Sequence, residues 1–203
     1  ARLSDARFFF DNDIRKGLDQ LSENLKNIIF HRSLGSMEKK VTRITSIVSK
    51  YSESFNAKSE LSLMAAKFCK ADLCSELVYE MPELQGNIGS IYASAIKLPN
   101  EVSTAIKEQY SPLGPSDKCP SIAEAAVLSF SDKLDSLVGF IAMDMKATGS
   151  KDPFGLRRSC LGIIRILLEK NVRVSIIDII NDSYDSYEKQ NTKLKLSKSE
   201  TNS

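Results

Sequence analysis

Apolar residues recur at every third or fourth position along almost the whole chain, which is the period of an α-helix. Prolines and short polar runs divide this pattern into separate stretches, and none of them alternates as a strand would. We expect helices over residues 18–28, 37–55, 61–79, 88–95, 100–110, 121–145, 153–170 and 175–189. The sequence therefore predicts an all-α fold, a bundle of about eight helices.

Local signals mark where several of these helices begin and end. Residues 111–120 hold three of the six prolines, so this segment is predicted to be an irregular loop. The helices after it begin at capping signals: Ser121 with Glu124, Asp152 before Pro153, and Ser175 with Asp178. Beyond residue 189 the chain is polar and rich in Lys and Ser, so we expect a domain over residues 1–189 and a flexible tail or linker over 190–203.

Composition excludes several kinds of site. The chain has a single histidine, His31, so designs that need several imidazoles do not fit. Its four cysteines, at positions 69, 74, 119 and 160, form no Cys-x-x-Cys pair and are interpreted as small apolar residues rather than metal ligands or a disulfide framework. We therefore expect no bound metal.

The most apolar window gives no candidate for a membrane span. Residues 161–180 contain five charged side chains, too many for a helix that crosses a bilayer. The first residues are charged and no apolar signal region follows them, so a cytoplasmic location is expected. The chain also starts without methionine inside a recognisable motif, which indicates a fragment of a longer polypeptide.

The charges are sorted along a chain whose net charge is only +2. Residues 1–50 carry ten basic and six acidic side chains, and residues 146–173 carry seven and two. Residues 51–145 between them carry seven and thirteen. Two basic blocks thus enclose an acidic one, which favours either local attraction of phosphate or pairing of the blocks inside the fold.

The helix over 121–145 is apolar or small on both sides, which is typical of a helix packed between others. Two carboxylates, Asp132 and Asp135, lie on it and would need partners if buried. Arg157 shares a helical arc with Phe154, Leu161, Ile164 and Leu168, an arc expected to face the core. We therefore predict a structural ion pair from Arg157 to Asp132 or Asp135.

Several segments together resemble one protein family, the beta subunit of bacterial-type glycine–tRNA ligase, in its HD-like helical domain. They occur in the family's order and cover nearly all of residues 1–167. They read ARLSDARFFF from residue 1, LGS from 34, AAKFCKADL from 65, EMPELQGNIGSIYA from 80, SDKLDSLVGF from 131 and GSKDPFGLRRSCLGIIRIL from 149.

The resemblance implies an HD-like helical bundle that has no active site of its own. It implies that the alpha subunit activates glycine with ATP and Mg²⁺, while the beta subunit contributes to recognition of tRNA(Gly). Asp72 and Asp132 are similar in position to the metal ligands of HD phosphohydrolases, but no histidine accompanies them, so we expect neither metal nor catalytic residues here. A metal-dependent phosphohydrolase and a helical scaffold without RNA contact are the alternative functions.

RNA recognition by this domain would use cations on phosphates first. The candidates are the basic residues of the opening motif, the 37–55 helix, the turn near residue 150 and the 153–170 helix. They are Arg2, Arg7, Lys39, Lys40, Arg43, Lys146, Lys151, Arg158 and Arg165.

Overall fold

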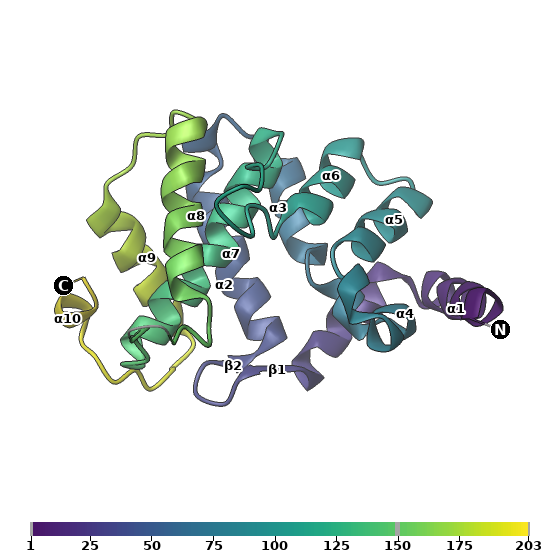
Figure 1. Cartoon of the computed structure of the whole chain (residues 1–203), viewed down its shortest axis with the longest axis horizontal. Coiled ribbons are helices and arrows are strands. Elements are labelled where there is room, and N and C mark those ends of the chain that lie inside the picture. The colour runs from purple at the N-terminus through teal and green to yellow at the C-terminus, as the bar shows by residue number, and fades with distance from the viewer. Residues whose placement is uncertain (1, 149–150, 203) are drawn as a thin grey trace.

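The computed structural model describes residues 2–148 and 151–202, with side chains from Asp5 onward. The longer helices carry most of the chain and are arranged as a bundle (Figure 1). They are α1 (Arg2–Glu23), α2 (Met37–Tyr51), α3 (Ser59–Phe68), α5 (Asn87–Ala95), α6 (Asn100–Glu108), α7 (Ala123–Ala142), α8 (Leu156–Glu169) and α9 (Ile176–Lys189). The shorter elements are α4 (Glu76–Glu80), α10 (Lys198–Thr201), four 3₁₀ turns and a hairpin of β1 (Ile29–His31) and β2 (Gly35–Ser36). The predicted all-α class is confirmed, and the small hairpin is an addition to it.

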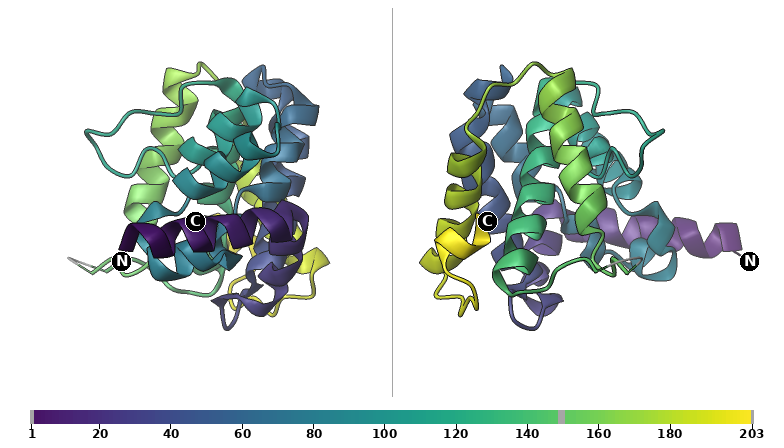
Figure 2. Two further views of the ribbon diagram at one scale, coloured as in Figure 1. Left: turned by 90° about the vertical axis from the view of Figure 1, so that its right-hand side faces the viewer. Right: turned by 60° about the vertical axis from the view of Figure 1, so that its left-hand side comes forward.

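Helix α7 forms the centre of the bundle. It contacts α2, α3, α6, α8 and α9, and its buried residues lie on all sides of the helix. The prediction that this helix is packed between others is therefore correct. Helix α1 lies at one end of the molecule and extends away from the bundle toward the N-terminus (Figure 2).

A buried carboxylate fixes the junction between α1 and the middle of the chain. Asp13 is 1% exposed and accepts hydrogen bonds from the amides of Glu76 and Leu77 at the start of α4 and from the Tyr92 hydroxyl of α5. The predicted helix over 61–79 is interrupted here by a 3₁₀ turn, Ala71–Cys74, after which α4 starts anew. Asp13 supplies the acceptor that the unpaired first amides of α4 require.

Two of the three predicted helix starts are found as caps. Ser175 accepts from the Asp178 amide, and the Asp152 carboxylate accepts from the amides of Leu156 and Arg157, so α8 starts three residues later than Pro153. The capping box of Ser121 with Glu124 is wrong. The Glu124 carboxylate instead accepts from the Lys58 amide at the start of α3, and Ser121 bonds Glu108.

Helix α8 turns the opposite face to the core from the one expected. Its buried residues are Leu156, Gly162, Ile163, Ile166 and Leu167. The arc of Phe154, Leu161, Ile164 and Leu168 is exposed, with Leu168 reaching 71%. Both faces of this helix are apolar, so periodicity alone does not distinguish them, and packing against α7 selects the face with the glycine, which permits closer approach.

The segment after residue 189 differs from the predicted flexible tail in its described part. The amides of Lys195 and Leu196 donate to the carbonyl of Ala142 at the end of α7, and the Tyr184 hydroxyl donates to the carbonyl of Leu196. A capping box of Ser197 and Glu200 then starts α10. Backbone hydrogen bonds to two helices thus compensate for the few apolar residues of this segment.

Candidate functional site

A cluster of buried charges joins α2 to α7. Asp135 is fully buried and accepts from Arg43 Nε at 2.6 Å, from Arg43 Nη2 at 3.2 Å and from Lys40 Nζ at 3.0 Å. The Arg43 guanidinium also lies 3.9 Å from the ring centroid of Tyr187, whose hydroxyl donates to the carbonyl of Asp135. One side of the cluster therefore belongs to α2, one to α7 and one to α9.

Asp132 continues this cluster one turn earlier on α7. Lys40 Nζ lies 2.9 Å from one oxygen of its carboxylate and Lys70 Nζ lies 2.7 Å from the other. Burial alone would raise the pKa of Asp132, but the two ammonium groups hold it well below its usual range. Burial would likewise lower the pKa of Lys70, but Asp132 raises it, so both groups stay charged at neutral pH.

The prediction that Arg157 pairs with one of these carboxylates is therefore wrong. Asp135 is buried and Asp132 is nearly buried, as expected, but their partners are Lys40, Arg43 and Lys70. Arg157 is exposed on α8, because the helix turns its Phe154 arc outward. The observed ion pairs join α2 to α7, two helices far apart in sequence. The apolar period of α8 gives no information about such partners.

Two proposed RNA contacts are excluded by the same cluster. Lys40 and Arg43 expose 3% and 1% of their surface, and their charged groups point at carboxylates inside the bundle. A phosphate in solution cannot reach them. Their predicted role in RNA binding is wrong, and their role is to fix α2 on α7.

Asp72 and Asp132, the two residues compared above with the metal ligands of HD phosphohydrolases, are held by groups of the protein itself. Asp72 is buried and accepts from the amides of Gly86 and Gly89 at 2.6 and 3.1 Å, so it fixes the start of α5. Burial raises the pKa of Asp72, and these two hydrogen bonds oppose that rise. Across residues 2–148 and 151–202, no three His, Cys, Asp or Glu side chains are grouped as a metal site would need. The Nδ1 atom of His31 accepts from the Ser33 amide, and the ring packs against Phe140.

Arg165 holds the proline-rich loop to the side of α8. Its guanidinium donates to the carbonyls of Gly114, Pro115 and Asp117 at 2.9–3.3 Å, and it pairs with Glu169. Only 30% of the side chain is exposed. These acceptors use the donors of the guanidinium, so Arg165 serves the loop in this structure rather than standing free for a phosphate.

Replacing Arg165 by glutamine is expected to lower the free energy of unfolding by about 1–2 kcal/mol, because three loop carbonyls would be left without a charged donor. Urea unfolding followed by circular dichroism measures this change. Arg158→Gln is the matched control on the same helix, since Arg158 has no hydrogen bond or ion pair within the described part of the chain; its change should stay within about 0.5 kcal/mol. Equal effects of the two substitutions would refute the structural role of Arg165.

The remaining candidate cations lie at the surface. The Arg7 side chain is 85% exposed and only 4.0 Å from Asp11, a weak contact. Lys39, Lys146, Lys151 and Arg158 are exposed as well. The side chain of Arg2 lies outside the described residues. Exposure is the first condition for a phosphate contact, and these residues meet it.

The structure gathers one of these cations with two that were not among the predicted RNA contacts. Arg32, Lys39 and Lys193 line a hollow of about 450 Å³ formed by the hairpin, the start of α2 and the segment after α9. No carboxylate is among the described residues that line it. Lys193 lies in the Lys-rich segment that was predicted to be a tail, and the composition of that segment is itself a signal for a cationic patch.

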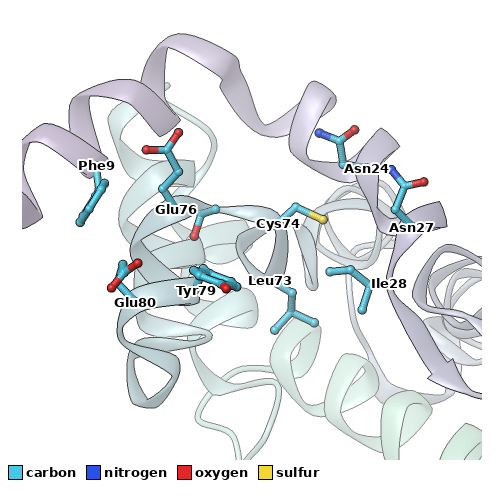
Figure 3. Close-up of a pocket in the computed structure, with 10 residues that line it drawn as sticks. Phe9, Asn24, Asn27, Ile28, Leu73, Cys74, Glu76, Tyr79 and Glu80 are labelled. Carbon is cyan, nitrogen blue, oxygen red and sulfur yellow. The ribbon is translucent and has the colours of Figure 1, made fainter.

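The groove between α1 and α4 has the opposite character. It has a volume of about 370 Å³ and an apolar floor that includes Leu73 and Ile28. Figure 3 shows Glu76 and Glu80 on the side of the groove near Phe9, so an anionic ligand would meet carboxylates there. This groove does not suit a nucleic acid.

Together these features define a class: an all-α domain in which lysine and arginine side chains hold Asp132 and Asp135 of the central helix, with a separate cationic hollow at the surface. The chain belongs to the glycyl-tRNA synthetase beta subunit family, because the sequence model of the family described as "Glycyl-tRNA synthetase beta subunit" matches residues 1–201.

Curated relatives carry the same description. The glycine–tRNA ligase beta subunit of Ruegeria sp. (strain TM1040) is 44% identical over 190 residues, which is 91% of this chain and 28% of the relative. That of Cereibacter sphaeroides is 46% identical over 184 residues, 89% of this chain and 26% of the relative. That of Rickettsia prowazekii is 45% identical over 188 residues, with 92% and 27% covered. The chain thus spans about a quarter of the length of these relatives.

Among the helices in the described ranges, none is both long and apolar enough to cross a bilayer.

Proposed function

We propose that this chain is an accessory tRNA-binding domain of a cytoplasmic glycine–tRNA ligase beta subunit and that it catalyses no step itself. It supports ATP-dependent glycylation of tRNA(Gly) at an active site in the alpha subunit, where ATP and Mg²⁺ are used. Its partners are tRNA(Gly), the alpha subunit and the remainder of the beta subunit. The observation that supports this function is the hollow of Arg32, Lys39 and Lys193, which has cations and no carboxylate, on a member of a tRNA ligase family.

The chemistry of this hollow suits an RNA backbone. Phosphates are recognised by lysine and arginine without regard to base sequence, and A-form RNA is read mainly through its backbone and shape. Lys146 and Lys151 lie in the segment that follows α7, and Met143 at the end of α7 lines the hollow, so further exposed cations lie close along the chain. A domain with this surface would add affinity, while other parts supply specificity.

The alternative of a metal-dependent phosphohydrolase is poorly supported by the residues present. Asp132 is already neutralised by two lysines, and Asp72 is held by backbone amides. A divalent cation at Asp132 would face the Lys40 and Lys70 ammonium groups at close range. The scaffold alternative predicts no RNA contact, and binding measurements distinguish it.

Replacing Lys39 and Lys193 together by glutamine is expected to weaken tRNA(Gly) binding about three- to tenfold near 0.1 M salt. The slope of log K against log salt should become shallower by about 1 for each phosphate that the variant no longer neutralises. Filter binding or fluorescence anisotropy across a salt series measures both quantities. Binding that is independent of salt would support the scaffold function instead.

The control replaces Lys50 and Lys67 by glutamine. Both side chains are exposed but are paired with Asp182 and Asp19, so the control removes the same formal charge away from the hollow. It is expected to change the salt slope by much less. An equal change in both variants would show that only net charge matters and would remove the hollow from the proposal.

A further inference from the structure

A second cavity lies between α7, the start of α8 and the loop before it. Its volume is about 210 Å³, and Lys133, Arg158, Ser159 and Asp132 line it with Tyr110. This volume leaves room for an ion with five heavy atoms. A further cavity of about 210 Å³ shares Arg158 and runs along α8 toward Arg165.

The cations that line this cavity form no ion pair with the described residues. Lys133 Nζ donates to the carbonyl of Tyr110 at 2.8 Å, and no described carboxylate lies within 4.0 Å of it. Arg158 forms neither a hydrogen bond nor an ion pair with residues 2–148 or 151–202. The Ser159 hydroxyl has no partner within those ranges either.

Asp132, the one carboxylate among the described residues that line the cavity, cannot neutralise them. Asp132 is held by both Lys40 and Lys70, which lie behind it in the bundle. Asp117, on the loop before α7, also acts on Lys133, but its carboxylate accepts hydrogen bonds from the amides of Leu113 and Lys118. Asp135 is held by Arg43 and Lys40. Positive charge therefore exceeds negative charge in a partly buried place, where the field of each charge is screened less than in water.

We propose that this cavity binds a phosphate group, with Lys133 and Arg158 as its charged ligands and the Ser159 hydroxyl as an additional donor. Arginine and lysine on two packed helices hold such an anion from two sides, and charge-assisted hydrogen bonds of this kind are the stronger ones. Burial lowers the pKa of Lys133 to about 8, and nearby Lys70 adds to this shift while Asp132 and Asp117 oppose it. A bound phosphate would oppose both causes and raise that pKa.

The source of the phosphate is the RNA backbone, and this part of the inference rests on the proposed function. The cavity opens beside Arg158, an exposed residue of α8, so a phosphate on a larger molecule can reach it. A free nucleotide carries the same phosphate group. The test below compares AMP with tRNA(Gly) to distinguish these two sources.

The test titrates the chain with inorganic phosphate at constant ionic strength, balanced with sodium chloride. The backbone amide signals of Gly155 and Ser159 and the ε-carbon signal of Lys133 report binding by NMR. We expect saturable shifts and a Lys133 pKa at least about one unit higher with phosphate than with chloride. Shifts that rise linearly without saturation, or that chloride reproduces, would overturn the proposal.

Variants place the phosphate on the named ligands. Lys133→Met keeps the aliphatic stem that packs beside Gly162, and Arg158→Gln changes an exposed side chain, so the second variant tests the site even if the first fails to fold. Each is expected to weaken phosphate binding at least fivefold. Arg157→Gln is the matched control, an exposed arginine on the same helix that does not line the cavity, and it should change the affinity less than twofold. An equal effect of Arg157→Gln would refute the assignment.

Titrations with AMP and with tRNA(Gly) follow the same signals. Competition between tRNA and phosphate, with a tRNA affinity that falls in Arg158→Gln and not in Arg157→Gln, supports an RNA phosphate in the cavity. Saturable phosphate or AMP binding without tRNA binding leaves the phosphate site standing and refutes the proposed function. Salt-dependent tRNA binding without saturable phosphate binding refutes the phosphate site and leaves the proposed function standing.

Discussion

Replacing Asp135 by asparagine is expected to lower the free energy of unfolding by about 3–5 kcal/mol. The carboxylate is fully buried, and three hydrogen bonds from Arg43 and Lys40 end on it. An amide of the same shape has no charge, so both cations would remain buried, and among the described residues Asp132 would be their one nearby counter-charge. The NH₂ group of the asparagine would also face the N–H donors of Arg43 and Lys40, with which it cannot form a hydrogen bond. Urea unfolding at pH 7, followed by circular dichroism, measures the change.

The control for this substitution is Asp19→Asn. Asp19 pairs with Lys67 at 2.6 Å, but both side chains are more than half exposed, so the destabilisation should be at most about 1 kcal/mol. If Asp135→Asn costs no more than Asp19→Asn, the buried cluster is not what fixes α2 on α7. If the two effects differ as expected, the difference measures what burial adds to an ion pair in this domain.

Replacing Gly139 by alanine is expected to destabilise the domain by about 2–3 kcal/mol, although alanine favours a helix by about 1 kcal/mol over glycine. A Cβ atom at this position of α7 would overlap the Tyr187 hydroxyl and lie 2.5 Å from the ring carbon Cζ. The ring cannot move aside freely, because its hydroxyl bonds the Asp135 carbonyl and Arg43 stacks on its face. Thermal and urea unfolding measure the destabilisation.

Two further variants test this explanation. Tyr187→Phe removes the overlapping oxygen, so the double substitution Gly139→Ala with Tyr187→Phe should recover part of the stability, and a double-mutant cycle measures the coupling. Gly114→Ala is the matched control, because a Cβ there meets nothing within 4 Å, and its effect should stay within about 0.5 kcal/mol. A stabilising Gly139→Ala would show that α7 and α9 pack less closely than the structure has them.

The helices themselves are largely predictable, because their signals are local. Caps act over three or four residues and the apolar period repeats every turn, so the helix from Ser175 to Lys189 is found with the predicted cap and end. The helix starting near Ser121 shows the limit of such signals. Its Glu124 has the spacing of a capping box with Ser121. The Glu124 carboxylate instead accepts a hydrogen bond from the Lys58 amide at the start of a different helix.

The candidate site is less predictable, because exposure decides which basic residues can contact RNA. Basic residues at positions 39, 40 and 43 look alike in sequence, and yet Lys39 is exposed while Lys40 and Arg43 are buried. Residues 39 and 40 differ by about 100° around the helix, so the face that meets α7 decides between an RNA contact and a structural ion pair. The sequence alone does not determine which face of the helix packs against α7.

By itself the sequence determined the helical class, the central place of the 121–145 helix, the need for partners at Asp132 and Asp135, and the resemblance to a tRNA ligase beta subunit. Only the tertiary structure decided that Lys40, Arg43 and Lys70 are those partners, that Arg165 holds a loop, and that Lys133 and Arg158 line one cavity. The physical reason is distance along the chain. Caps and periodicity act within one or two helical turns, whereas these contacts join residues that are tens of positions apart and depend on which face of each helix is buried.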